Sequence, residues 1–153
     1  MANTYTQIHI HVVFAVQNRA SLISESWEME LHKYMSGIIQ HNNHKVLAIN
    51  GTNDHIHILF GFRPTQSLSD LMQDVKGCSS KWINQRRLCP GRFSWQEGYG
   101  GFSYSKSQLP KVARYIENQK QHHQKRTFCQ EYLKMLRDFE VEFDGRYIFK
   151  PIE

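Results

Sequence analysis

The pattern of apolar residues along this chain predicts an α+β fold of the ferredoxin-like type. Three observations support it. Alternating apolar residues indicate strands, apolar residues at helical spacing indicate helices, and the elements follow one another as strand, helix, hairpin, helix and strand. This order is the split β-α-β pattern, an antiparallel sheet with helices on one face, here with an added C-terminal helix. The opposite face of the sheet is expected to be free.

The first part of the chain supplies three strands and a helix. Residues 4–16 are mainly apolar at every second position, which predicts a first strand. Ser24 can cap a helix that continues to about residue 41 with an apolar stripe along one side. Residues 45–50 and 55–62 predict a hairpin, because turn-forming residues separate them.

The middle of the chain supplies the second helix and the last strand. Ser67, with Asp70 three residues later, resembles a capping box and begins a second amphipathic helix. A fourth strand is expected either at residues 93–96 or at residues 102–105. These elements complete the ferredoxin-like order.

A glycine-rich connector, residues 98–106, leads into the added helix. We expect this helix at residues 107–122, with Ser107 as its cap and Pro110 tolerated near the first turn. Thr127 and Gln130 predict the start of a last short helix.

The end of the chain has the pattern of a hairpin. Asp144-Gly145 is a turn-forming pair between two short runs of strand-forming residues, 141–143 and 146–148. A closing hairpin is therefore expected.

Length and composition favour one globular domain spanning residues 1–153. Hydrophobic residues make up 40% and charged residues 22% of the chain, which is close to the average for folded domains. Neither a signal peptide nor a run of 18 apolar residues is present, so we expect no membrane association. The three cysteines show no C-x-x-C spacing, which favours free thiols in the cytoplasm over disulfides or a zinc knuckle.

Basic charge is concentrated in one region. Residues 76–126 contain eleven Lys or Arg residues against two Glu residues, within a chain whose net charge is +5. The same region interleaves aromatic residues, and exposed rings can stack unpaired bases while cations contact phosphates. Single-stranded nucleic acid is therefore the expected partner. The alternatives are a solvated basic face without a partner and rings that fill the core.

Two short motifs carry candidate chemistry. In His55-Ile56-His57 the two histidines project from the same face of the predicted strand, and paired imidazoles are common ligands of divalent metals. Tyr115 and Gln119 are four residues apart, so a helix laid across that strand could deliver both. One would be a ligand and the other a nucleophile.

Each motif is weak when taken alone. A strand H-x-H is more often a structural pair than a metal site, and His9-Ile10-His11 repeats the pattern. Tyr and Gln four residues apart are commonly a packed ring and a surface amide. His122 and His123 could add ligands, although their basic neighbours favour contact with phosphate or solvent. The prediction depends on the conjunction of all these features in one small domain.

With these motifs, the chain resembles the single-tyrosine HUH transposases of small bacterial and archaeal insertion sequences and their domesticated, repeat-associated relatives. His55-Ile56-His57 is similar to the His-hydrophobic-His element of the family, and residues 115–119 to its catalytic helix. Residues 93–105 resemble its aromatic and glycine-rich segment, and residues 76–80 also fit. The resemblance covers nearly the whole chain and does not place metal ligands at His9-Ile10-His11.

The resemblance implies a DNA strand transferase that cuts and rejoins single-stranded DNA at insertion-sequence ends, beside hairpins that it binds. Tyr115 would be the nucleophile, and His55, His57 and Gln119 would hold Mg²⁺ or Mn²⁺. Attack would leave a 5′-phosphotyrosine and a free 3′-hydroxyl, so rejoining needs no nucleotide cofactor.

The resemblance also implies a homodimer. The glycines before the catalytic helix would let it swing to complete the site of the partner subunit, whereas a tight turn would close the site within one chain. Candidate DNA-binding residues are Lys76, Lys81, Arg86, Arg87, Arg92, Lys111, Arg114, Lys120, His122 and His123.

Two other classes of function remain. One is a catalytically inactive or domesticated protein that binds single-stranded DNA or hairpins. The other is a metal- or histidine-dependent nucleotide hydrolase in which Tyr115 has no role. A covalent adduct with DNA discriminates among the three.

Overall fold

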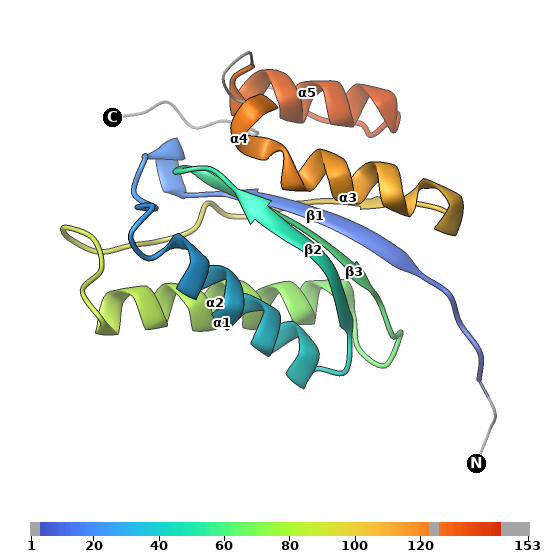
Figure 1. Ribbon diagram of the computed structural model, residues 1–153, viewed down its shortest axis with the longest axis horizontal. Helices are drawn as coiled ribbons and strands as arrows, with labels where there is room; N and C mark the ends of the chain where they lie inside the picture. The colour runs from blue at the N-terminus through green and yellow to red at the C-terminus, as the bar shows by residue number, and fades with distance from the viewer. Residues whose placement is uncertain (1–3, 123–125, 145–153) are drawn as a thin grey trace.

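A four-stranded antiparallel sheet forms the middle of the protein in the computed structural model, which describes residues 4–122 and 126–144 (Figure 1). The strand order is β2-β3-β1-β4, so β1 and β3 are central. The strands are β1 (His9–Ala15), β2 (Lys45–Gly51), β3 (His55–Gly61) and β4 (Gly100–Ser103). The α+β class, the predicted hairpin and the antiparallel sheet are confirmed.

The two predicted amphipathic helices, α1 (Glu28–His41) and α2 (Leu68–Gln85), cover one face of the sheet, below it in Figure 1. The even-numbered side chains of β1 and β3, among them Phe14, Ile58 and Phe60, pack against these helices in the largest apolar cluster. Alternation along the strands thus places the main core on this face.

The opposite face is not free, contrary to prediction. The helices α3 (Leu109–Glu117) and α5 (Phe128–Asp138) lie above it in Figure 1, joined through the short α4 (Gln119–His122). Leu59 of β3 packs with Val112 and Ile116, and Val13 of β1 belongs to a second cluster with α5. Val13, Ala15 and Leu59 make part of this second face apolar, so it also needs a covering layer.

The two strands of the β2–β3 hairpin approach each other closely where β2 ends, at Gly51. Gly51 pairs with Ile56, and a Cβ atom added at Gly51 would collide with the carbonyl oxygen of His55. A glycine is therefore required directly before the turn that leads to the first histidine.

Several predicted boundaries differ from those observed. The first helix begins at Glu28 rather than near Ser24, and the first strand begins at His9. The fourth strand is β4, while Trp95 pairs with Val16 only in an isolated bridge. Within residues 4–122 and 126–144, the 3₁₀ helices are η1 (Gln17–Arg19) and η2 (Lys106–Gln108).

The predicted glycine connector is partly strand, because Gly100 and Gly101 belong to β4. Ser105, rather than Ser107, forms the capping box at the following helical turn. Of the predicted closing hairpin, residues 141–144 have no regular structure, and the second arm at 146–148 lies outside the described residues. Among the residues described, no helix has the length and apolar character to cross a membrane.

Candidate active site

His55 and His57 lie side by side on the face of β3 that α3 and α5 cover. Because β3 is a central strand, both side chains are fully buried. Their ring centroids are 5.1 Å apart. The predicted pairing of the two imidazoles is therefore present.

A second contact orients each imidazole. Nδ1 of His55 donates to Oδ1 of Asp54 at 2.7 Å, since a carboxylate can only accept, and lies 2.9 Å from the hydroxyl of Thr52. Nδ1 of His57 shares a hydrogen bond of 2.8 Å with Nε2 of His11. Both Nε2 atoms consequently point to the same volume, as expected of metal-ligating histidines with supporting partners.

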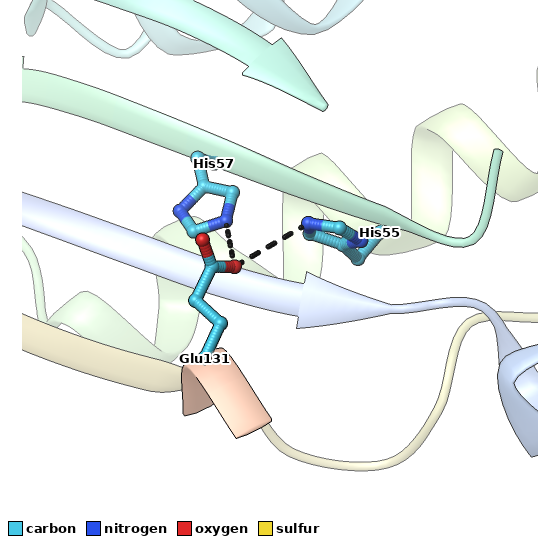
Figure 2. Close-up of side chains that lie close together, drawn as sticks. All are labelled: His55, His57 and Glu131. Carbon is cyan, nitrogen blue, oxygen red and sulfur yellow. Dashed lines mark hydrogen bonds and ion pairs between the residues drawn. The ribbon is translucent and has the colours of Figure 1, made fainter. Parts of the chain in front are cut away.

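Glu131 of α5 places its carboxylate between the two histidines (Figure 2). Its Oε1 accepts from Nε2 of His57 at 2.8 Å and lies 3.6 Å from Nε2 of His55. The helix is anchored at its start by the Thr127 capping box and by Phe128, whose ring stacks on His55 at 4.5 Å. Glu131 is thus a site residue that the sequence patterns did not predict.

Tyr115 and Gln119 reach the same volume from α3 and α4. The Tyr115 hydroxyl donates to Oε2 of Glu131, and Nε2 of Gln119 donates to the same oxygen at 3.1 Å. Oε1 of Gln119 lies 3.2 Å from Nε2 of His55. All four residues predicted for the site therefore meet within one chain.

The helix that carries them is interrupted, unlike the predicted continuous helix over 107–122. α3 ends at Glu117, Asn118 leaves the helical conformation, and Gln119 begins α4. The side-chain amide of Asn50 on β2 donates to the Glu117 carbonyl at 2.9 Å. This contact satisfies a carbonyl at the helix end and fixes the break beside the histidines.

The site controls the protonation of two neighbouring groups. The pKa of Tyr115 is raised, first by burial and then by the charge and hydrogen bond of Glu131. The pKa of His11 is well below its usual range, because burial and the neighbouring His57 outweigh the attraction of Glu131. At neutral pH Tyr115 is therefore a protonated donor, and His11 is uncharged.

The donor set fits a divalent cation. His55 donates through Nδ1, so Nε2 of the neutral ring carries a lone pair. This lone pair faces Oε1 of Gln119 and Oε1 of Glu131. A cation bound between the nitrogen and the two oxygens would accept electron density from all three atoms. His55, His57 and Glu131 offer ligand atoms within 4.8 Å of one another. Adjacent ligands of an octahedral Mg²⁺ at about 2.1 Å lie about 3 Å apart. The observed separations of 2.8 to 3.6 Å are close to that spacing.

The predicted DNA-binding residues fall into two groups. Lys81, Arg86, Arg87 and Arg92 are exposed on α2 and the segment after it, and Arg86 lies over the Trp82 ring. Lys111, Arg114 and Lys120 are exposed on the side of the active site.

Two of the predicted DNA-binding lysines contact other parts of the protein. Lys76 donates to the carbonyls of Gln96 and Gly98, both at 2.7 Å, so it stabilises a loop. Lys120 forms an ion pair with Glu28 at 2.9 Å. The side chain of His122 and all of His123 lie outside the described residues.

The aromatic residues of the basic region are mostly core residues. Phe93, Trp95 and Phe102 are buried, and Tyr99 and Tyr104 are partly buried. The expectation that these rings form an exposed base-stacking platform is wrong for the three buried ones. Composition alone does not distinguish a ring that packs in the core from one that faces solvent.

Comparison with known proteins identifies the family. The family model described as "Transposase IS200 like" matches residues 4–119. The ISDra2 transposase TnpA of Deinococcus radiodurans is 23% identical over 119 residues, covering 74% of this chain and 84% of that protein.

Two solved structures have the same fold. A candidate transposase from Deinococcus radiodurans R1 has a TM-score of 0.61 at 20% identity and covers 78% of this chain and 95% of its own. A REP-associated tyrosine transposase bound to a REP hairpin has a TM-score of 0.61 at 13% identity and covers 100% of this chain and 96% of its own. With a family match over most of its length, this chain belongs to the IS200-like transposase family.

Proposed function

We propose that this protein is a metal-dependent transposase that cuts and rejoins single-stranded DNA through a covalent 5′-phosphotyrosine at Tyr115. The observation that carries the proposal is the meeting of Tyr115, His55, His57 and Gln119 on one buried face of the sheet. A phenol beside a buried cluster of metal-ligating groups is suited to attack on a phosphodiester.

The chemistry conserves the phosphodiester energy. The Tyr115 oxygen attacks phosphorus, an oxygen–phosphorus bond forms, and the bond from phosphorus to the 3′ oxygen breaks. A 5′-phosphotyrosine and a free 3′-hydroxyl result, and attack by a 3′-hydroxyl on the phosphotyrosine rejoins the strand. No nucleotide cofactor is required.

A divalent cation, Mg²⁺ or Mn²⁺, would be held by Nε2 of His55 and His57 with oxygens of Gln119 and Glu131. When bound, it supplies positive charge that lowers the cost of the negative charge developing on the scissile phosphate. The chain itself supplies the nucleophile and holds the ligands at rigid positions on β3, α4 and α5.

A pocket beside the site offers a path for the DNA strand. It has a volume of about 610 Å³, and its lining includes Gln130, the basic residues Lys120 and Arg126, and the acidic residues Glu25, Glu28 and Asp54. Asp54 and Gln130 directly precede His55 and Glu131 in the chain, so this pocket borders the catalytic residues. Arg126 can contact a phosphate that flanks the scissile bond, whereas Lys120 is paired with Glu28 in the same lining.

Hairpin DNA is the substrate class that we favour. The REP-associated transposase with this fold is bound to a REP hairpin. In this chain, the exposed basic residues of α2 and α3 supply positive charge on two sides of the sheet. We further propose that the protein acts in the cytoplasm as a homodimer.

The test is a search for a covalent protein–DNA adduct. Labelled single-stranded hairpins from the DNA flanking the gene are incubated with protein and Mn²⁺, then separated under denaturing conditions. The wild type should give a labelled adduct and a free 3′-hydroxyl product. Tyr115→Phe should give neither, while binding the hairpin as tightly as the wild type.

Tyr104→Phe is the matched control, because it removes the hydroxyl of another partly buried tyrosine on this face. It should retain adduct formation. Cleavage by Tyr115→Phe would contradict the proposal, and cleavage without an adduct would indicate a hydrolase. Hairpin binding with no cleavage by the wild type would instead support a binding protein.

A further inference from the structure

The carboxylate of Glu131 presents different oxygens to two parts of the site. Oε1 accepts from His57 at 2.8 Å, whereas Oε2 accepts from the Tyr115 hydroxyl and from Nε2 of Gln119. The nucleophile and the histidine pair are therefore joined through one side chain. Only 3% of Glu131 is exposed, so little water competes for these contacts.

Glu131 lies outside the segment that matches the family model, which ends at residue 119. It reaches the site because α5 packs back on the sheet through Phe128, Met135 and Leu136. Its position in the first turn of α5 also suits an anionic side chain. The family motifs alone give no role to this residue.

A buried phenol needs a proton acceptor when it attacks phosphorus. A general base must lie within hydrogen-bond reach of the proton that it removes. Oε2 of Glu131 meets this condition, because it accepts a hydrogen bond from the Tyr115 hydroxyl. Gln119 donates to the same oxygen, which holds the carboxylate in place. A carboxylate can take up the proton, whereas a neutral amide cannot do so readily.

We propose that Glu131 is the general base for Tyr115. This inference rests on the proposed strand-transfer function. As Oη of Tyr115 attacks, its O–H bond breaks, the proton moves to Oε2 of Glu131, and the Oη–phosphorus bond forms. The bond from phosphorus to the 3′ oxygen breaks with its electron pair on oxygen, and that oxygen takes a proton from water.

Rejoining reverses these steps. The attacking 3′-hydroxyl gives its proton to water, and Glu131 returns its proton to the departing oxygen of Tyr115. No oxidant, nucleotide or further reactant is needed. Glu131 is thereby a catalytic residue that returns to its ionised form after one cycle of cleavage and rejoining.

The experiment compares Glu131→Gln with the wild type in single-turnover adduct formation at saturating Mn²⁺. Gln keeps the size of the side chain and a hydrogen-bonding oxygen but does not act as a base. We expect the rate to fall by about 10² to 10⁴-fold, the usual contribution of general base catalysis. Glu131→Asp, which retains a carboxylate, should be faster than Glu131→Gln.

A fluorinated tyrosine at position 115 separates proton removal from other roles of Glu131. Its hydroxyl is more acidic and depends less on a base, so the loss caused by Glu131→Gln should shrink by about tenfold or more. An equal loss with ordinary and fluorinated tyrosine would overturn the inference. So would wild-type activity of Glu131→Gln once its own Mn²⁺ site is saturated, because that result would assign the residue to metal binding alone.

Two readouts are independent of activity. The first is the Mn²⁺ dissociation constant of each variant, which must be known so that saturation can be verified. The second is the carbon-13 signal of the ring carbon bonded to the Tyr115 hydroxyl in metal-free protein, which should change in Glu131→Gln and stay unchanged in Gln130→Glu. An unchanged signal in Glu131→Gln would contradict the hydrogen bond on which the inference depends.

The inference and the proposed function can fail separately. If the wild type forms no covalent adduct, strand transfer itself is wrong. If the wild type forms the adduct and Glu131→Gln forms it equally fast, strand transfer stands and Glu131 is not the base.

Discussion

The Nε2 atom of His11 on β1 lies 2.8 Å from the Nδ1 atom of His57 on β3, and this contact connects the first strand to the candidate metal site. Val13, not His11, is the direct cross-strand neighbour of His57, so the two histidines meet diagonally on one sheet face. A cation on Nε2 of His57 requires a proton on Nδ1, and the uncharged His11 can accept the resulting hydrogen bond.

Replacement of His11 should therefore weaken metal binding without removing a ligand. We expect His11→Phe to raise the Mn²⁺ dissociation constant by about 10- to 100-fold, the usual effect of losing a partner behind a ligand. His11→Gln should lose less, because its amide can still accept a hydrogen bond. Titration with Mn²⁺ followed by electron paramagnetic resonance measures both constants.

His9→Phe is the matched control, since His9 belongs to the same H-x-H pattern two residues earlier. It should bind Mn²⁺ as the wild type does. Equal losses in His9→Phe and His11→Phe would contradict a specific role for the His11 contact.

Metal binding should also stabilise the fold. Wild-type protein at 100 times the dissociation constant of Mn²⁺ should gain about 2.7 kcal/mol of unfolding free energy, and a chelator should reverse the gain. His57→Ala should lose this response. His44→Ala, which alters a buried histidine that contacts Gln66 instead, should keep it.

Thermal unfolding with and without Mn²⁺ measures the effect. A stabilisation that persists unchanged in His57→Ala would locate the metal elsewhere. Activity that is complete in chelator would argue against any catalytic cation.

The histidine pair could be predicted from the sequence because strand periodicity determines which side chains share a face. His55 and His57 are two residues apart on one strand, so they point to the same face whichever elements cover that face. Glu131 could not be found in this way, since its arrival depends on how α5 turns back after α4 and packs on that face. A capping box at Thr127 predicted the helix but not its position relative to the histidines.

Two further differences between the predicted and the observed site also arise from contacts between distant segments of the chain. The spacing of Tyr115 and Gln119 predicted that they act together, but the break at Asn118 depends on a contact with β2 that no local pattern records. The family resemblance places no metal ligand at His9-Ile10-His11, so it predicts no role for His11. Only the strand pairing reveals which of the two H-x-H patterns supports the other.

Gly100 should be essential for the close approach of β4 and α5. A Cβ atom at this position would lie 2.7 Å from Cε1 and 2.8 Å from the hydroxyl of Tyr132, the residue after Glu131. Gly100→Ala should therefore displace the start of α5 and lower the unfolding free energy by about 1 to 3 kcal/mol. It should also slow adduct formation.

Gly77→Ala is the control. Gly77 lies within helix α2, and a Cβ atom added there would meet no atom within 4 Å. It should stabilise the protein by about 0.5 to 1 kcal/mol. Chemical denaturation measures both variants. Wild-type stability in Gly100→Ala would show that the sheet and α5 have room for the added methyl group.

The free energy of unfolding should fall as the pH falls below about 6.5, the ordinary pKa of histidine. Burial lowers the pKa of His32 on α1, opposed by Glu28 and assisted by Lys120. Between the lowered folded pKa and the ordinary value, the unfolded chain binds the proton more readily, so unfolding free energy decreases with falling pH. His32→Leu should reduce this slope.

His41→Leu, an exposed histidine on the same helix, is the control and should retain the wild-type slope. Urea denaturation at several values between pH 5 and pH 7.5 measures the dependence. A slope that is the same in all three proteins would exclude His32 as a source of acid sensitivity.

The final prediction is that each active site is completed by the tyrosine of its own chain. Tyr115 contacts Glu131, and Glu131 contacts His57, within a single subunit. Gly100 and Gly101, which were expected to let the catalytic helix swing to a partner, are paired with β1 instead. Tyr115→Phe and His57→Ala proteins, when mixed, should therefore remain inactive, because every site carries one lesion.

A second mixture tests the same point through a loss of activity instead of a recovery. Wild-type protein is incubated with an excess of the Tyr115→Phe/His57→Ala double variant, after subunit exchange has been verified with labelled chains. If sites form within one chain, adduct formation follows the amount of wild type and the excess has no effect. If sites form between chains, every mixed dimer has a lesion in both sites and activity falls with the excess. Restored activity in the first mixture together with loss in the second would establish exchange and overturn the prediction.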